Sequence, residues 1–285
     1  MALLSGAAGL SVLVTIGIVF ALAAPAIDFF RQVSIVDFLT GTNWSPRFAG
    51  QESYGILPLV TGTAWTTVIA LCIAIPFGLG AAVYLSEYAP PRVRKVLKPV
   101  LEVLAGIPSV VYGYFALTFV APVVLRDILS IDVGTFSVLA AGLVLGIMII
   151  PTVASLSEDA MSAVPLSLRQ GSLALGANKM RTTLRVVFPA AISGIAASVV
   201  LGLSRAVGET MIVALAAGTQ PRIVTGPTQY GQTMTGYIAQ TATGESTPGT
   251  LGYESLYAVG LLLFVITLLI NIVSIRLVRR FREAY

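Results

Sequence analysis

The sequence contains no histidine, one cysteine and few charged residues. Only 11% of its 285 residues are Asp, Glu, Lys or Arg, against about 25% in soluble proteins. Without histidine the chain has no histidine-based metal site or histidine general base, and a lone cysteine, Cys72, excludes an internal disulfide. No other group of residues has the spacing of a metal site or a catalytic set. We therefore expect no metal site and no catalytic residues.

Apolar residues, by contrast, are abundant. They make up 56% of the chain, and the mean hydropathy is +0.91. A soluble fold this apolar would expose large hydrophobic patches. A membrane-crossing helix needs about 20 apolar residues, so the sequence predicts an all-α, polytopic membrane protein with six transmembrane helices. The predicted helices cover residues 7–30, 57–85, 97–125, 135–155, 190–217 and 255–277.

The first apolar run has two interpretations. Ala21-Leu22-Ala23 is similar to a signal-peptide cleavage site, but no Lys or Arg precedes the run and it is longer than a signal-peptide core. We therefore expect an uncleaved helix in a single transmembrane domain, 1–285, with its core at 57–280. Two loops interrupt the apolar pattern, at 31–56 and 218–254. The first loop is expected to hold a short interfacial helix near 34–39, with Trp44 among the lipid headgroups.

The basic residues are distributed unevenly among the loops. Twelve of the 17 fall after the second run, after the fourth run, or in the C-terminal tail. Because basic loops stay in the cytoplasm, both chain termini are predicted to be cytoplasmic. The twelve are Arg92, Arg94, Lys95, Lys98, Arg169, Lys179, Arg181, Arg185, Arg276, Arg279, Arg280 and Arg282; the others are Arg31, Arg47, Arg126, Arg205 and Arg222.

Two of the charged residues lie inside an apolar run. Arg205 and Glu209, flanked by Ser204 and Thr210, lie near the middle of the run at 190–217. A charge at the centre of a membrane helix costs about 2.5–3.5 kcal/mol, and residues four apart share one helix face. One interpretation is an ion pair that joins this helix to its neighbours. The other is that Arg205 lines a polar path and Glu209 is its resting counter-charge.

The amphipathic segment at 156–189 is the second candidate functional region. Ser162 is predicted to cap a helix that has Pro165 in its first turn. Gly171 and Gly176 have the spacing of a phosphate-binding loop, but Ala177-Asn178 follow instead of Lys-Ser/Thr, so we expect no ATP hydrolysis by this chain. From composition alone, the segment either binds another protein or lies on the bilayer surface.

The spacing within this segment resembles the cytoplasmic motif E-A-A-x3-G-x9-I-x-L-P of ABC importer permeases. Gly176 and Pro189 match the motif, while the first three positions depart from E-A-A. The resemblance implies a type I importer permease (MetI-like) fold and a coupling helix that docks on a separate ATPase. The residues at those positions are Gln170, Gly171, Ser172, Gly176, Val186, Phe188 and Pro189.

Four further segments resemble the PstC permeases of phosphate-specific ABC importers. They are Phe38–Pro46, Tyr54–Thr63, Ala105–Gly113 and Arg205–Thr210. This resemblance implies a permease subunit of an ATP-driven phosphate importer in a prokaryotic plasma (inner) membrane, with Arg205 meeting the phosphate. The N-terminus is shorter than in that family, so we expect a cytoplasmic tail to be missing.

The resemblance also implies partners. They are a PstA-like sister permease, two copies of a PstB-like ATPase that bind ATP and Mg, and a PstS-like phosphate-binding protein that docks on the loops at 31–55 and 218–254. No cofactor is expected in this chain. The sequence leaves open another oxyanion as substrate (sulfate, molybdate or phosphonate), a channel or secondary carrier that works alone, and a signalling or scaffold subunit.

Overall fold

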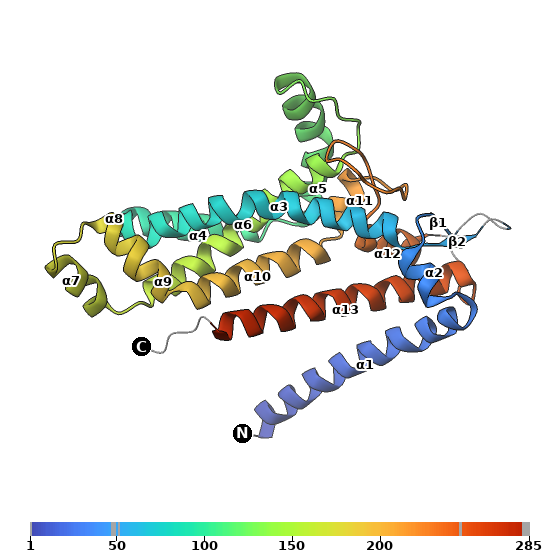
Figure 1. The fold of residues 1–285 in the computed structure, drawn as a ribbon, viewed down its shortest axis with the longest axis horizontal. Helices are drawn as coiled ribbons and strands as arrows, with labels where there is room; N and C mark the ends of the chain where they lie inside the picture. The colour runs from blue at the N-terminus through green and yellow to red at the C-terminus, as the bar shows by residue number, and fades with distance from the viewer. Residues whose placement is uncertain (1, 47–49, 51, 245–246, 281–285) are drawn as a thin grey trace.

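The chain folds into a bundle of long helices that run along the long axis of the molecule (Figure 1). The computed structural model describes residues 2–46, 50, 52–244 and 247–280. These residues are mostly helical, which confirms the all-α prediction apart from one hairpin whose two strands have two residues each. The long helices are α1 (Ala2–Gln32), α3 (Leu57–Val83), α6 (Val138–Ser162), α10 (Ile192–Gly208) and α13 (Leu251–Arg280).

Within the described residues, five helical segments are long and apolar enough to cross a membrane. A sixth crossing is present if the bent pair Lys179–Ala190 and Ile192–Gly208 counts as one span. Four of the five agree with predicted runs, whereas the third and fifth predicted runs differ in their boundaries. The four are Leu4–Gln32, Leu57–Tyr88, Val138–Ser162 and Leu251–Arg276.

Helices α3 and α6 pack closely at the centre of the bundle. A Cβ on Gly146 would lie 2.8 Å from the carbonyl oxygen of Ala70, and one on Gly142 would lie 2.7 Å from the Cβ of Ile69. Small residues let two membrane helices approach closely enough for their backbones to touch. Cys72, two residues beyond Ala70 on α3, is exposed.

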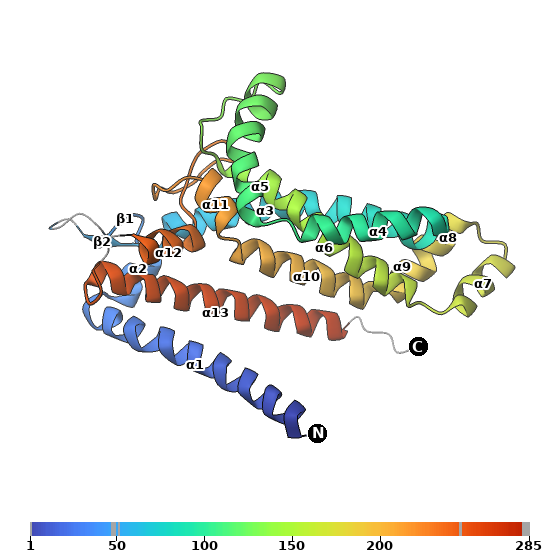
Figure 2. The same cartoon turned by 180° about the vertical axis from the view of Figure 1, so that it is seen from behind.

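The third predicted run, 97–125, is not one helix. Helix α4 (Pro91–Ala105) ends before Pro108, because proline disfavours a helical conformation in the residue before it. α5 (Ser109–Phe115) and the π-helical segment η2 (Ala116–Ile128) follow, and η2 turns away from the bundle in both views (Figures 1 and 2). Helix α4 contacts α6, and none of its residues is buried.

The fifth predicted run, 190–217, is bent at its start and broken near its end. Three short segments precede α10, and the chain bends by 71° between Ala190 and Ile192. Helix α10 then stops at Gly208, and α11 (Met211–Ala216) begins three residues later. One straight crossing over 190–217 is therefore wrong. The preceding segments are α8 (Lys179–Thr182), η3 (Thr183–Val187) and α9 (Phe188–Ala190).

Aromatic side chains hold together one end of the bundle, which contains α2 (Ile35–Thr40), the hairpin of β1 (Trp44–Ser45) and β2 (Ser53–Tyr54), and α12 (Met234–Thr243). Helix α2 confirms the short helix expected near 34–39. Trp44 is only 3% exposed, and its ring centroid lies 4.9 Å from that of Tyr237. Trp44 therefore packs inside the protein, and its depth at headgroup level stays a prediction. The aromatic cluster consists of Phe29, Phe38, Trp44, Tyr54 and Tyr237.

The opposite end of the bundle carries α7 (Leu166–Ala174) and π-helical η1 (Tyr84–Tyr88). The N-terminal end of α1 and the C-terminal end of α13 both point toward this α7 end (Figures 1 and 2). The loop between α3 and α4 also lies there, so the basic loops are gathered at one end as the charge distribution predicted. Arg47 and Arg282, counted in that distribution, lie outside the described residues.

Candidate functional site

The break between α10 and α11 is the centre of the candidate site. Glu209 leaves the helix with an extended backbone, at φ −67° and ψ 133°. Its Oε1 then accepts hydrogen bonds from the backbone N–H groups of Met211, at 3.0 Å, and Ile212, at 3.4 Å. A carboxylate at the start of a helix satisfies N–H groups that have no partner within the helix. The side chain of Glu209 therefore stabilises the beginning of α11.

Arg205 lies in the last turn of α10 and points toward α6. Its Nη1 donates to Oγ1 of Thr152 at 3.0 Å. Among the described residues, no ion pair within 4.0 Å joins Arg205 to Glu209. The prediction that the two share one helix face as a charge pair is wrong, because the helix ends between them and backbone amides take up the carboxylate.

Ser204 and Thr210, the other two predicted pathway residues, make different contacts. The hydroxyl of Ser204 donates to Oδ1 of Asn271 on α13 at 3.1 Å, and that of Thr210 donates to the carbonyl oxygen of Gly208 at 3.3 Å. The structure thus brings the four predicted residues into one short segment. It directs Arg205 toward α6 and Ser204 toward α13.

These four side chains are all half-buried within the single chain. Non-helical backbone at membrane depth is tolerated only where it is covered by protein or lines a water-filled cavity. The half-buried guanidinium therefore requires water or a second chain beside it. Chemically, the segment offers charged and hydroxyl donors that suit an anion. Within the described residues, no three His, Cys, Asp or Glu side chains lie close enough to share a metal ion.

The predicted coupling residues lie on and around α7. Gln170 and Gly171 are exposed, and Ser172 is half-buried with its hydroxyl 2.9 Å from that of Thr182. Gly176 ends the helix with a left-handed φ of 81°. Its N–H donates to the carbonyl oxygen of Leu173, and the N–H of Ala177 donates to that of Ser172. This is a Schellman helix end, which favours glycine at the left-handed position.

Large apolar side chains around α7 are exposed. Leu173 is 50% exposed, Leu175 is 90% exposed and Met180 is 64% exposed. Pro189, the last predicted coupling residue, is also exposed and lies on α9. Helix α7 is not among the apolar spans, and exposed apolar side chains outside membrane-crossing segments are typical of a protein-binding surface.

The prediction that Ser162 caps α7 is wrong. Helix α6 continues through Ser162, and the side chain bonds to Glu158 and Arg94 instead. Thr152 and Glu158 on α6 were not among the residues predicted for the site. The predicted fourth run ended at residue 155, so Glu158 was expected in the loop that follows it. The signal that could have corrected this is the helical spacing of Thr152, Ser155, Glu158 and Ser162.

Comparisons with known proteins identify the family of the chain. Residues 74–283 match a family described as "Binding-protein-dependent transport system inner membrane component". The chain is 40% identical to the probable ABC transporter permease protein YqgH of Bacillus subtilis, over 83% of this chain and 75% of YqgH. It is 36% identical to the phosphate transport system permease protein PstC 1 of Mycobacterium tuberculosis, over 85% and 81% of the two chains.

A solved structure shows the same fold. A chain of the bacterial alginate ABC transporter, determined in complex with an alginate-bound periplasmic protein, superposes with a TM-score of 0.68. The match covers 99% of this chain and 96% of that one at 16% identity, so it bears on the fold alone. It confirms the ABC importer permease fold that the sequence motifs implied.

Proposed function

The chain belongs to the family of binding-protein-dependent transport system inner membrane components, and from this premise we propose that it is the PstC-like permease subunit of an ATP-driven importer of inorganic phosphate. The observation that supports this most directly is a half-buried arginine, Arg205, beside a helix break in an otherwise apolar run. Arginine presents a planar fork of N–H donors that matches phosphate oxygens, and its charge persists in a low-dielectric passage.

Arg205 would meet the anion in the passage. A guanidinium has five N–H donors, and within the described part of the chain Arg205 makes one hydrogen bond, to Thr152. Most of its donors therefore remain available to a passing oxyanion. Glu209 holds the start of α11 and adds a negative charge nearby, which opposes permanent retention of the anion.

A PstA-like sister permease would complete the passage. The half-buried side chains at the break need a cover that the single chain does not provide. The exposed α7 end would dock on a separate PstB-like ATPase, with Gln170, Gly171, Ser172, Gly176 and Pro189 at or near the contact. That ATPase would bind ATP and Mg, and this chain would supply no ATPase site.

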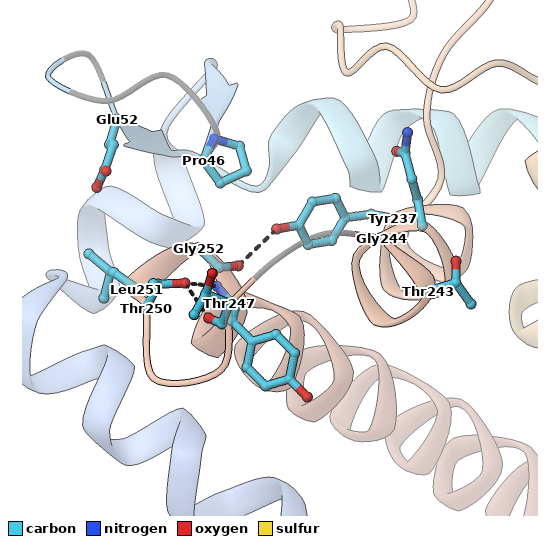
Figure 3. Close-up of a pocket in the computed structure, with 11 residues that line it drawn as sticks. Pro46, Glu52, Tyr237, Thr243, Gly244, Thr247, Thr250, Leu251 and Gly252 are labelled. Atoms are coloured by element: carbon cyan, nitrogen blue, oxygen red, sulfur yellow. Dashed lines mark hydrogen bonds between the residues drawn. The ribbon is translucent and has the colours of Figure 1, made fainter.

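The aromatic end has a cavity suited to a PstS-like phosphate-binding protein. Its volume is about 690 Å³, and both predicted extracytoplasmic loops contribute to it (Figure 3). Pro46 and Glu52 come from the first loop, and Tyr237, Gln240 and Thr250 come from the second. Polar and hydroxyl groups open to solvent are common at wet, transient protein interfaces.

As a member of its family the chain is a multi-pass protein of the inner membrane. We infer that the α7 end is cytoplasmic, because the basic loops gather there. Both termini would then be cytoplasmic, and the aromatic end would face outward.

Replacing Arg205 by glutamine tests the proposal. In the assembled complex, R205Q should reduce uptake of radiolabelled phosphate by roughly 100-fold, because losing a hydrogen-bonded charge typically costs about 2–5 kcal/mol. The sister permease and ATPase should still co-purify with the variant. R92Q, the same replacement at an exposed residue of α4, should leave uptake unchanged.

Three results would contradict the proposal. Uptake by R205Q at the unaltered rate would make Arg205 structural. Competition by sulfate but not by arsenate would identify another oxyanion as substrate. Transport in liposomes without any ATPase would indicate a channel or secondary carrier.

A further inference from the structure

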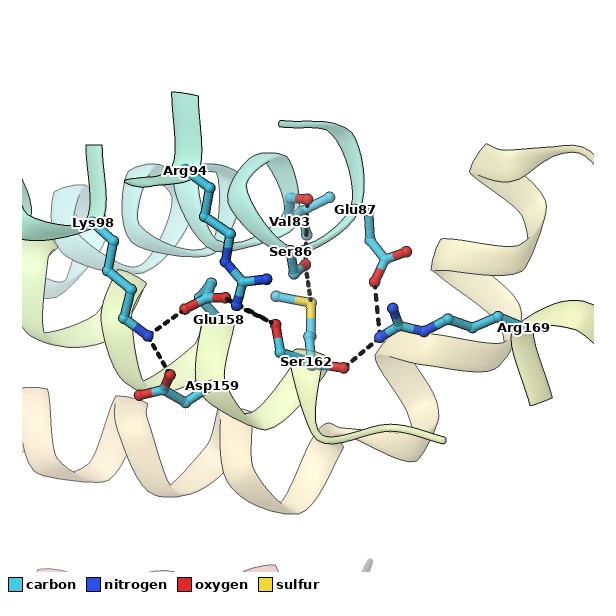
Figure 4. A network of polar contacts seen from close by, with 10 residues as sticks. Val83, Ser86, Glu87, Arg94, Lys98, Glu158, Asp159, Ser162 and Arg169 are labelled. Atoms are coloured by element: carbon cyan, nitrogen blue, oxygen red, sulfur yellow. Dashed lines mark hydrogen bonds and ion pairs between the residues drawn. The ribbon is translucent and has the colours of Figure 1, made fainter. Parts of the chain in front are cut away.

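A cluster of ionised side chains joins four helical segments near the α7 end (Figure 4). We call it the polar cluster. It connects η1, α4, α6 and α7, and the anion pathway proposed above does not use it. Its members are Glu87, Arg94, Lys98, Glu158, Asp159, Ser162 and Arg169.

Glu158 is the centre of the polar cluster. Its side chain is 1% exposed, yet both oxygens have partners. Oε1 accepts from Arg94 and, at 2.8 Å, from the hydroxyl of Ser162, while Oε2 accepts from Lys98 at 2.7 Å. Burying a carboxylate is costly unless it is paired and hydrogen-bonded. Glu158 therefore depends on the two cations of α4.

Lys98 ties α4 to α6 through a second carboxylate as well. Its Nζ donates to Oδ1 of Asp159 in addition to Glu158. Helix α4 is not among the apolar spans, and hydrogen bonds to Asp159 and Glu158 raise the pKa of its Lys98 amine. The cation is therefore stable at physiological pH. Helix α4 has no buried residue, and Arg94 and Lys98 provide its side-chain hydrogen bonds to α6.

Arg169 connects α7 to the same region. Its Nη2 lies 3.1 Å from Oε1 of Glu87 on η1 and donates at 2.6 Å to the carbonyl oxygen of Met161 on α6. The side chains of Arg169 and Glu87 are only 17% and 7% exposed. Met161 lies within one turn of Glu158, so the last turn of α6 touches both halves of the polar cluster.

Helix α4 is connected, through α5, to the break between α10 and α11. Beyond Gly106-Ile107-Pro108 the chain continues as α5, which packs against α11. A Cβ on Gly113 of α5 would lie 3.1 Å from the carbonyl oxygen of Met211. Displacement of α4 would therefore reach the first residue of α11, two residues after Glu209.

We propose that the polar cluster transmits movement of α7 to the arm formed by α4 and α5, with Glu158 as a positioning residue for transport. This rests on the proposed function, because it needs α7 to contact an ATPase. Ion pairs suit this task, since such networks have discrete arrangements that can exchange without opening a cavity. Packed apolar side chains resist displacement much more strongly.

The replacement E158Q tests this in the assembled complex in liposomes. The unaltered complex must first show ATP-dependent phosphate uptake, and its absence there would contradict the proposed function rather than this inference. With E158Q, we expect the ATPase to co-purify and hydrolyse ATP. Phosphate transported per ATP should fall by about 5- to 150-fold, the usual range for coupling between sites. An unchanged ratio would overturn the inference.

A charge exchange distinguishes coupling from simple loss of folding. E87R and R169E should each lower phosphate transported per ATP, and the double variant should recover most of the loss. The matched control is D28R with R31E, an exposed pair at 2.9 Å on α1, which should leave the ratio unchanged singly and together. A double variant no better than the poorer single variant would overturn the inference.

Discussion

The two ends of this molecule are held together by different forces. At the aromatic end, ring edges pack against ring faces, with the centroids of Phe29 and Tyr54 5.2 Å apart at 82°. At the α7 end, an apolar cluster that includes Met161 and Val187 is supplemented by carboxylates, guanidiniums and an amine, which join η1, α4, α6 and α7. Edge-to-face aromatic packing adds about 0.5–1.5 kcal/mol per pair beyond burial, while a buried ion pair often adds little net stability.

This difference matches the tasks proposed for the two ends. The aromatic cluster fixes the hairpin and α12 beside α1 and α13, so that a docking partner meets a preformed surface. Burial, together with a hydrogen bond to Glu52, raises the pKa of Tyr54 at that end, which keeps the phenol neutral. The polar cluster connects the helices that we propose to move during transport. The aromatic end therefore suits a rigid docking surface, and the α7 end suits the movement proposed above.

The largest expected effect is at the aromatic end. W44A should lower the free energy of unfolding by about 3–5 kcal/mol, the usual cost of removing a large buried ring. L175A at the α7 end should change it by no more than about 0.5 kcal/mol, because Leu175 is 90% exposed. Denaturation midpoints in detergent measure both. Equal losses in the two variants would remove the contrast between the ends.

Raising the ionic strength should weaken the α7 end more than the aromatic end, with a smaller effect than W44A. Raising it from about 0.1 M to about 1 M shortens the Debye length from about 10 Å to about 3 Å. Asp159 is 55% exposed and Arg94 is 40% exposed, so their pairs should weaken by up to about 1 kcal/mol. Hydrogen exchange of α4 amides should accelerate by up to about fivefold, with α2 and β1–β2 as internal controls. Equal acceleration at both ends would argue against an ionic attachment of α4.

The most local effect should come from α7 itself. G171A should stabilise this helix by about 0.5–1 kcal/mol, because glycine is costly inside a helix and a Cβ there meets nothing within 4 Å. G176A should destabilise the same helix by about 1–2 kcal/mol, since its φ of 81° is strained for alanine. Hydrogen exchange within α7 reports both changes. Identical behaviour of the two variants would contradict the Schellman helix end.

The sequence predicted the helical bundle, four of its spans and the gathering of basic loops at one end. These features depend on composition and on uninterrupted apolar runs, which one chain displays directly. The bend after Ala105 and the break after Gly208 were missed as boundaries. Both runs are mostly apolar, with only Lys98, Glu102, Arg205 and Glu209 as charged residues, and hydropathy does not register a change of direction. Glycine and proline at Gly106 and Pro108 favour a bend at this point, but its extent depends on packing.

The residues of the candidate site were predicted, but their contacts were not. Arg205 and Glu209 were found because charges are rare in apolar runs. Their pairing was wrong because a carboxylate four residues away can bond to backbone amides as readily as to a guanidinium. Glu158 was missed for a different reason. Its partners Arg94 and Lys98 lie about 60 residues away along the chain, and a sequence read segment by segment does not bring them together.

The close contact of α3 with α6 provides a reference frame for watching the protein work. Glycines at the crossing leave no room for one helix to slide over the other. The one cysteine of the chain, Cys72, is exposed on this pair. A fluorophore attached to that thiol would label a pair of helices that cannot slide over each other. A quencher placed on α4 would then record the motion of that arm alone.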